Sequence, residues 1–254
     1  MRARSLRHAG AVAAVTTLAL ALTACGAEEK KTEDTGKADA SASASASAAA
    51  KPDVKALPAA ELEKLLVTQA DLKGYQVQPA KPGERVNAGD VSADKAACET
   101  LAEALSWAAP GTPGASATVK TIQVPDKKKE SFEGAIGALV APVTSVTLGS
   151  YAGEGAQQAF ASLKTAGTEC AGGFTVHGGG VTTKVHKVEP DTVTAGDEAL
   201  AWTVTRDMGG EPFVTKLAVL RKGNTLAGFS TLSVSGEVKE QPKAVIAAQT
   251  AKLG

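Results

Sequence analysis

The fold of this chain is decided by residues 213–234, which read FVTKLAVLRKGNTLAGFSTLSV. Two runs rich in apolar and β-branched residues, 213–221 and 225–234, flank the tripeptide Lys222-Gly223-Asn224. Gly and Asn tolerate the positive φ angles of a tight hairpin turn, and β-branched residues favour extended backbone. The stretch therefore predicts two antiparallel strands joined by a short turn.

Further strands are expected on the N-terminal side of this hairpin. Leu200, Trp202 and Val204 occupy every second position of one run, and Val181 and Val185 share a face in an earlier one. This spacing is typical of a strand with one buried face. A β-α-β rhythm is absent from this half of the chain, so we expect neighbouring strands to be connected by hairpins.

Helical patterns occur mainly in the first two thirds of the chain and at its C-terminus. Apolar residues recur there at spacings of three and four, as on the buried face of a helix. The expected helix starts are Pro58, Ser92 as an N-cap, Gly153 and Pro242. The last helix is expected to bury Val245, Ile246, Gln249 and Leu253. Short strands are expected over 75–78, 119–124 and 143–150.

Together these elements predict one α+β domain over residues 57–254. We expect a twisted antiparallel sheet with helices packed on one face, because helices and hairpin-linked strands occupy different parts of the chain. A hydrophobic content of 43% with few aromatic residues is enough for a core rich in Ala.

Residues 1–24 have the organisation of a secretory signal peptide. Arg2, Arg4 and Arg7 form a basic start without an acidic residue, and an uncharged run follows from Ala9 to Ala24. That run has 16 residues, which is shorter than the roughly 20 that a transmembrane helix needs. The segment therefore predicts export.

The run ends in Leu22-Thr23-Ala24-Cys25-Gly26, which resembles a lipobox. In that motif the Cys25 thiol receives a diacylglycerol, and a peptidase cleaves before it. Membrane lipid would then be a partner of the chain, since two acyl chains hold a protein on a bilayer where one binds marginally. We expect a lipoprotein on the outer face of the cytoplasmic membrane. Plain secretory cleavage near Ala24 and an uncleaved anchor are the alternatives.

Residues 25–56 are interpreted as the lipidated cysteine and a disordered tether rich in Ala and Ser. From Ser41 to Ala48 the two residue types alternate, and no large side chain here could offset the entropy of ordering the backbone. About 30 flexible residues span roughly 30 Å. After removal of residues 1–24 the chain has 24 Lys and Arg against 27 Asp and Glu. That balance offers no basic field for nucleic acid.

Several motifs and their spacing resemble the extracellular sensor domain of the PknH receptor kinases, which many actinobacterial lipoproteins share. The motifs are Cys98 on an early helix, Ser150-Tyr151 before a helix with Ala159 and Phe160, Cys170 at its end, Gly196 to Ala199, the late hairpin 219–224 and a closing helix with Gln249. The resemblance covers residues 57–254. It implies a sensor or ligand-binding module with a cleft over a twisted sheet. The kinase has two disulfides, whereas this chain has cysteines for one.

Cys98 and Cys170 are expected to form one structural disulfide. They are the cysteines left once Cys25 is lipidated, and exported proteins fold in an oxidising compartment. Two buried free thiols are the alternative. We expect neither a metal site nor a cofactor, because residues 25–254 contain two histidines, His177 and His186, and no Cys-x-x-Cys.

Sequence motifs predict no catalytic residue. His177-Gly178-Gly179-Gly180 resembles the oxyanion-hole run of some esterases, but the chain lacks a G-x-S-x-G elbow. We interpret that run as a glycine-rich hairpin connection. Ser92-Ala93-Asp94-Lys95 fits S-x-x-K without its companion motifs. Lys127-Lys128-Lys129 is interpreted as a solvated loop, with contact to anionic envelope polymers as the alternative.

The leading hypothesis is therefore a non-enzymatic envelope lipoprotein, a sensor or ligand-binding module. Its partner would be a small molecule, a lipid or an envelope protein, and we expect a groove near Tyr151, His177 and Trp202. Core packing is the default interpretation of both aromatic residues, and a place in the lining of a cleft is the other. An envelope hydrolase with an unrecognised active site and an accessory lipoprotein without a ligand are the competing functions. A cleft that is apolar and free of paired ionisable groups would favour binding, and convergent acids would favour catalysis.

Overall fold

A computed structural model describes residues 54–124 and 140–254, all within one of two compact units of the chain, residues 49–254. The other unit, residues 1–48, lies outside the described residues. So do the predicted leader, Cys25, the tether up to residue 53 and the Lys127-Lys128-Lys129 run. None of the helices within the described ranges has the length and hydrophobicity that a membrane crossing requires.

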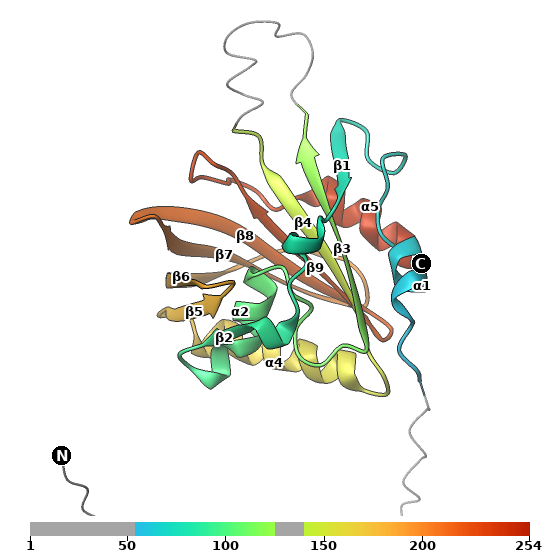
Figure 1. Ribbon diagram of the computed structural model, residues 1–254, viewed down its shortest axis with the longest axis horizontal. Helices are drawn as coiled ribbons and strands as arrows, with labels where there is room; N and C mark the ends of the chain where they lie inside the picture. The colour runs from blue at the N-terminus through green and yellow to red at the C-terminus, as the bar shows by residue number, and fades with distance from the viewer. Residues whose placement is uncertain (1–53, 125–139) are drawn as a thin grey trace, which may run out of the picture. The chain divides into compact units, whose positions relative to one another are not determined.

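The described residues form a nine-stranded sheet in which each neighbouring pair of strands is antiparallel. The strand order is β1-β3-β4-β9-β8-β7-β6-β5-β2 (Figure 1). The strands are β1 (Tyr75–Pro79), β2 (Val91–Ala93), β3 (Ala115–Gln123), β4 (Val143–Ser150), β5 (Phe174–Gly178), β6 (Val181–Asp191), β7 (Glu198–Met208), β8 (Glu211–Lys222) and β9 (Thr225–Leu232).

Helices accompany this sheet along the described chain. The α-helices are α1 (Ala59–Lys64), α2 (Glu99–Leu105), α4 (Gly155–Glu169) and α5 (Lys243–Leu253). Short 3₁₀ turns are η1 (Pro82–Glu84), η2 (Ala88–Asp90) and η3 (Ala96–Cys98). The predicted α+β class and antiparallel sheet are therefore confirmed.

The hairpin predicted from residues 213–234 is formed by β8 and β9. Lys222 pairs with Thr225, and Gly223 between them has a φ of 56°. On its other side β9 pairs with β4 over the full length of both strands. The hairpin thus joins the strands of the N-terminal half to the run of hairpins from β5 to β8.

Helices cover both faces of the sheet, which corrects the expectation that they pack on one. Leu217 and Val219 of β8 lie in a core with α2 and α4, which we call the α4 face. Ala218 and Leu220 of the same strand lie in a second core with α1 and α5, the α5 face. The four residues are consecutive and apolar, so both sides of β8 must be removed from water.

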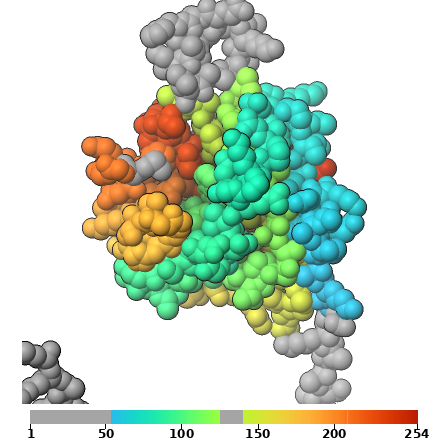
Figure 2. Space-filling view, in the orientation of Figure 1, coloured from blue at the N-terminus to red at the C-terminus, as the bar shows by residue number. Residues whose placement is uncertain are grey.

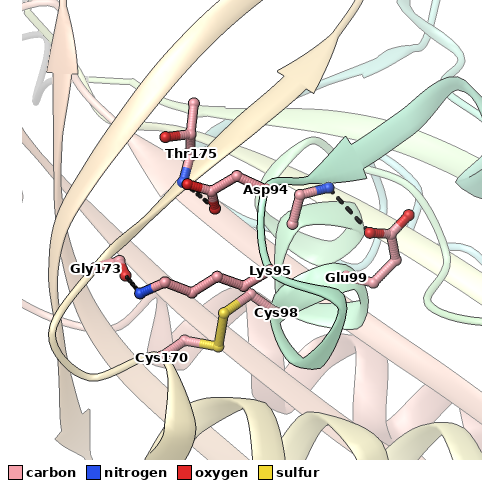
Figure 3. Close-up of a disulfide and its surroundings, with 8 residues drawn as sticks. Asp94, Lys95, Cys98, Glu99, Cys170, Gly173 and Thr175 are labelled. Carbon is pink, nitrogen blue, oxygen red and sulfur yellow. Dashed lines mark hydrogen bonds between the residues drawn. A yellow bond between two sulfur atoms is a disulfide. The ribbon is translucent and has the colours of Figure 1, made fainter.

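The predicted disulfide joins Cys98 to Cys170, which lie 72 positions apart in sequence. Around it, the Lys95 ammonium donates to the Gly173 carbonyl at 2.7 Å, and the Thr175 N–H donates to the Asp94 carboxylate at 2.8 Å (Figure 3). That bond holds the pKa of Asp94 below its usual value. The bridge and both hydrogen bonds fix the segment before α2 to the corner between α4 and β5.

Ser92 does not cap the second helix as expected. It lies in β2 opposite His177 of β5, and the helix begins later, at Glu99. Val91 beside it is buried in the core of the α4 face, so extended backbone here both buries Val91 and adds an edge strand to the sheet.

The folded unit begins slightly before residue 57. The Val54 carbonyl accepts a hydrogen bond from Gly153 N–H at 2.7 Å, and Leu57 N–H donates to the Ser150 hydroxyl at 2.9 Å. Residues 54–56, which the sequence assigned to the tether, thus already contact the domain. All the strand pairings and both cores lie between residues 54 and 254, so a chain that begins at Ala49 contains the whole core and is expected to fold by itself.

Candidate functional site

The three residues predicted to line a ligand groove do not converge on one cavity. His177 is exposed on β5, with its Nδ1 3.1 Å from the Thr182 hydroxyl of β6. Its glycines form the β5–β6 turn, as expected, because Gly179 and Gly180 have φ angles of 57° and 75°. Of five cavities on the described surface, Trp202 lines one, and neither Tyr151 nor His177 lines any.

Tyr151 and Trp202 both belong to the core of the α4 face. Tyr151 is 1% exposed, and its hydroxyl donates to the Pro110 carbonyl at 2.6 Å. Burial raises the pKa of this phenol, so it remains a donor. Trp202 is 4% exposed and packs so tightly on α4 that a Cβ at Gly167 would overlap its indole nitrogen. Both positions agree with the default interpretation, core packing.

Two cavities flank α5, and they form the candidate site. The first lies over part of a row of polar side chains that crosses the α5 face from strand to strand. Register places Thr203, Lys216, Thr231, Thr144 and Thr121 side by side on β7, β8, β9, β4 and β3. The Thr144 and Thr231 hydroxyls are 2.9 Å apart, whereas the Thr121 hydroxyl is buried without a partner. Such a row supplies donors and acceptors in a face that is otherwise apolar.

An ion pair lies at the β7 end of this row. The Lys216 ammonium donates to the Thr203 hydroxyl at 2.7 Å and to the Asp191 carboxylate at 3.1 Å. Burial pushes the pKa of Asp191 upward, but hydrogen bonds from Thr192 N–H, the Gln241 amide and Lys216 outweigh it. The net pKa lies below its usual value, so the pair is charged at neutral pH.

The first cavity, the polar cavity, has a volume of about 560 Å³. Thr144 and Thr231 belong to its floor, and Gln241 to its wall. The Gln241 amide nitrogen donates to Asp191 at 3.1 Å, while its carbonyl oxygen is buried without a partner. The other lining residues are Tyr75, Gln123, Pro142, Ser235, Glu237, Val238, Lys239, Glu240, Pro242, Lys243 and Ala244.

The second cavity, the apolar groove, lies between α5 and the segment before β7 and has a volume of about 750 Å³. Its lining contains no acidic side chain, and its charged side chains are Lys222 and Lys243. Lys243 also lines the polar cavity. The other lining residues are Thr192, Val193, Thr194, Ala195, Gly196, Ile246, Ala247, Thr250, Ala251 and Gly254. An apolar wall with a few placed cations suits an anionic amphiphile.

Neither motif considered for catalysis is arranged as its enzymes require. Ser230 lies inside β9 and not on a turn from a strand to a helix, and the Lys95 ammonium of the S-x-x-K run donates to the Gly173 carbonyl. Within residues 54–124 and 140–254, no group of three or more His, Cys, Asp or Glu side chains could hold a metal ion.

Sequence reasoning missed the residues around these cavities. Threonines on strands are ordinary β-formers, so nothing in the sequence marked Thr144 and Thr231 as neighbours. Gln241 precedes the Pro242 that begins the last helix, but a single glutamine carries no signal. The apolar groove had a weak signal, since Ala247 and Ala251 of the last helix are exposed small residues between lysines.

No protein family model matches this chain, and no curated protein matches it. Among solved structures, a weak resemblance is found to the extracellular domain of PknH from Mycobacterium tuberculosis. The sequences are 12% identical, and the TM-score is 0.43. The likeness covers 78% of this chain and 97% of that domain.

Proposed function

We propose that this chain is a lipid-anchored envelope protein whose folded domain binds an anionic amphiphile and does not catalyse a reaction. The proposal has two parts, the location of the protein and the chemistry of its ligand.

The location is supported by the leader, Cys25 and the disulfide. Disulfides persist in exported proteins and are rare in a reducing cytosol, and Cys98 and Cys170 are bonded. The lipobox-like run before Gly26 would then place the acylated Cys25 in the membrane. From there a tether of roughly 30 residues would let the domain meet small molecules and lipids at the envelope surface.

The chemistry of the proposed ligand is inferred from the apolar groove. Its volume of about 750 Å³ lies in the range of small-molecule sites. An acyl chain would lie against Ile246, Ala247 and Ala251, and its anionic head would lie at Lys243, beside the polar cavity. Lys243 is free to turn toward such a head, because its pair with Glu240 is 3.5 Å long and about three quarters exposed.

The absence of acidic side chains from the groove lining supports binding over hydrolysis. Glycoside hydrolysis needs two carboxyl groups across the scissile bond, and nucleophilic catalysis needs a base within reach of the nucleophile. The described lining offers two lysines and three threonines, but no Asp, Glu or His side chain. The envelope hydrolase therefore has no support from this cavity.

A calorimetric titration of the chain from Ala49 tests the ligand, with laurate and dodecyl maltoside as probes. The two have the same alkyl chain, and laurate alone is charged. We expect laurate to bind more tightly than the maltoside, and Lys243→Ala to abolish that preference. Ala251→Trp should fill the groove and weaken both probes. Ala161→Trp, the same change on the exposed side of α4, should weaken neither.

Equal binding of laurate by the Ala251→Trp variant would contradict the groove. Turnover of an ester or glycoside by the purified domain would contradict the non-enzymatic assignment.

A further inference from the structure

Arg206 of β7 is a partly buried cation at the end of the α4 face. Its Nε–H donates to the Thr215 hydroxyl at 3.1 Å, and its guanidinium carbon lies 5.9 Å from the centre of the Phe213 ring. Phe213 is 4% exposed, and Thr215 is completely buried. Two neighbours on β8 thus fix the plane of the guanidinium, one through a hydrogen bond and one through the face of its ring.

No carboxylate neutralises this charge in the part of the chain that the structure describes. Arg221 in the same sheet, by contrast, contacts Glu198 at 2.7 Å and Asp197 at 3.3 Å. Burial lowers the pKa of Arg206, which reflects the cost of keeping the cation away from water. Charges that are partly removed from water are commonly paired, and Arg206 has no such partner among the described residues.

The terminal nitrogens of Arg206 remain available. Its Nε is bound to Thr215, whereas neither Nη has a partner among the described residues. Unlike the unpartnered side-chain atoms that are sealed from solvent, both Nη atoms remain accessible, so an incoming molecule can reach them. Two parallel N–H groups of this kind match the oxygens of a carboxylate or phosphate.

Two unpartnered hydroxyls lie on the same face. Ser230 of β9 pairs with Leu217 of β8 and with Ser145 of β4, which places both serines on the α4 face two positions along from Thr215. They are 2% and 1% exposed, and neither hydroxyl oxygen has a hydrogen-bond partner within the described ranges. Both oxygens are sealed from solvent and lie in the row of Leu217 and not in that of Phe213, the partner of Arg206, so a ligand at Arg206 would be bound by the guanidinium and not by these serines.

Nearby charges do not compete for Arg206. Lys120, in the row of Ser145, is bound to Glu84 at 2.6 Å. Asp207, next to Arg206 on β7, is bound to His186 at 2.6 Å. Figure 2 shows a hollow in this face of the molecule between the teal segment and the orange and red strands.

We infer that Arg206 is the centre of an oxyanion-binding site, distinct from the groove beside α5. The two Nη groups would donate to a carboxylate or phosphate group of the ligand, with Thr215 and Phe213 holding the guanidinium in place. The ligand would supply the negative charge that no carboxylate of the described residues provides to Arg206. This inference does not depend on the proposed function, because it rests on the opposite face of the sheet.

The test is a titration of the chain from Ala49 with inorganic phosphate and with acetate, against chloride at matched ionic strength. One oxyanion should bind more tightly than chloride and raise the melting temperature. Arg206→Lys keeps the charge but removes the paired donors, so it should weaken that binding at least tenfold. Arg221→Lys, at an arginine that already has two carboxylate partners, should leave the affinity unchanged.

Vesicles distinguish a lipid source of the phosphate from a free one. If the domain is retained on phosphatidylglycerol vesicles but not on phosphatidylcholine vesicles, and Arg206→Lys loses this retention, the ligand is a lipid headgroup. If the domain binds free phosphate but is not retained on vesicles, the ligand is soluble. Equal binding of oxyanions and chloride would overturn the site, and so would an unchanged affinity in Arg206→Lys. Melting of each variant without ligand checks that it is folded.

Discussion

The side chain of Gln249 in α5 bonds to the backbone at Val67, 182 residues away in sequence. Its carbonyl oxygen accepts a hydrogen bond from Val67 N–H at 3.0 Å, and its amide nitrogen donates to the Leu65 carbonyl at 2.7 Å. Gln249 is completely buried. One amide thus satisfies two backbone groups after α1 and joins the first and last helices across the α5 face.

Replacing Gln249 by Leu should destabilise the domain by about 2–4 kcal/mol, because it leaves two buried backbone groups without a partner. Urea unfolding of the chain from Ala49 measures the change. The matched control is Gln158→Leu on the exposed side of α4, which should change the stability by less than about 0.5 kcal/mol. Equal effects of the two substitutions would mean that the bridge does not hold α5 to α1.

Loss of the disulfide should cost about 2–5 kcal/mol, as the chain-entropy model gives about 4 kcal/mol for a loop of 72 residues. Cys170→Ala and reduction of the wild-type protein should have similar effects in thermal unfolding. Intact mass should rise by about 2 Da on reduction, since two hydrogens are added when a disulfide opens. Two thiols that alkylate in the native, unreduced protein would contradict the bridge.

Tyr151→Phe should destabilise the domain by about 1–3 kcal/mol, because the Pro110 carbonyl loses its buried donor. His177→Ala should leave the melting temperature nearly unchanged, since that side chain is exposed. A thermal unfolding series compares the two variants. If Tyr151→Phe were neutral while ligand binding fell, the phenol would serve the ligand and not the core.

Asp191→Asn should destabilise the domain at pH 7 by about 1–2 kcal/mol, because Lys216 loses its counter-charge. The folded pKa of Asp191 lies below its ordinary value of 3.8, so its contribution is complete above that pH and disappears as the pH falls through the folded pKa. Denaturation curves at pH 7 and pH 3 measure the difference in unfolding free energy between variant and wild type, which should shrink at the lower pH. A difference that grew on acidification would refute this prediction.

Cys25→Ser should release the protein from the membrane fraction or leave an unprocessed precursor, because the lipid transferase needs that thiol. Fractionation and intact mass in an actinobacterial host provide the measurement. The control is the double variant Cys98→Ser/Cys170→Ser, which should stay with the membrane although its domain is weakened. A Cys25→Ser protein of mature size that remains membrane-bound would disprove the lipid anchor.

The hairpin, the strands and the disulfide could be predicted because each depends on neighbouring residues or on residue type. Lys222-Gly223-Asn224 specifies its turn locally, and the two cysteines of the described domain leave one pairing. The helix start at Ser92 could not be predicted, because burial of Val91 in the core outweighs the capping preference of serine. The consecutive apolar residues 217–220 did carry the signal that both faces of the sheet are covered.

The sequence by itself determined the antiparallel α+β domain and the cysteine pair, and it predicts the leader and its lipobox, since periodicity, turn chemistry and short motifs are local properties. Tertiary structure alone decided which side chains are functional candidates. It buried Tyr151 and Trp202, exposed His177, brought Lys243 to the rim of two cavities and left Arg206 without a carboxylate. Those outcomes depend on the register of strands far apart in the chain, and no local pattern encodes which polar groups will meet across a sheet and which will remain unpaired.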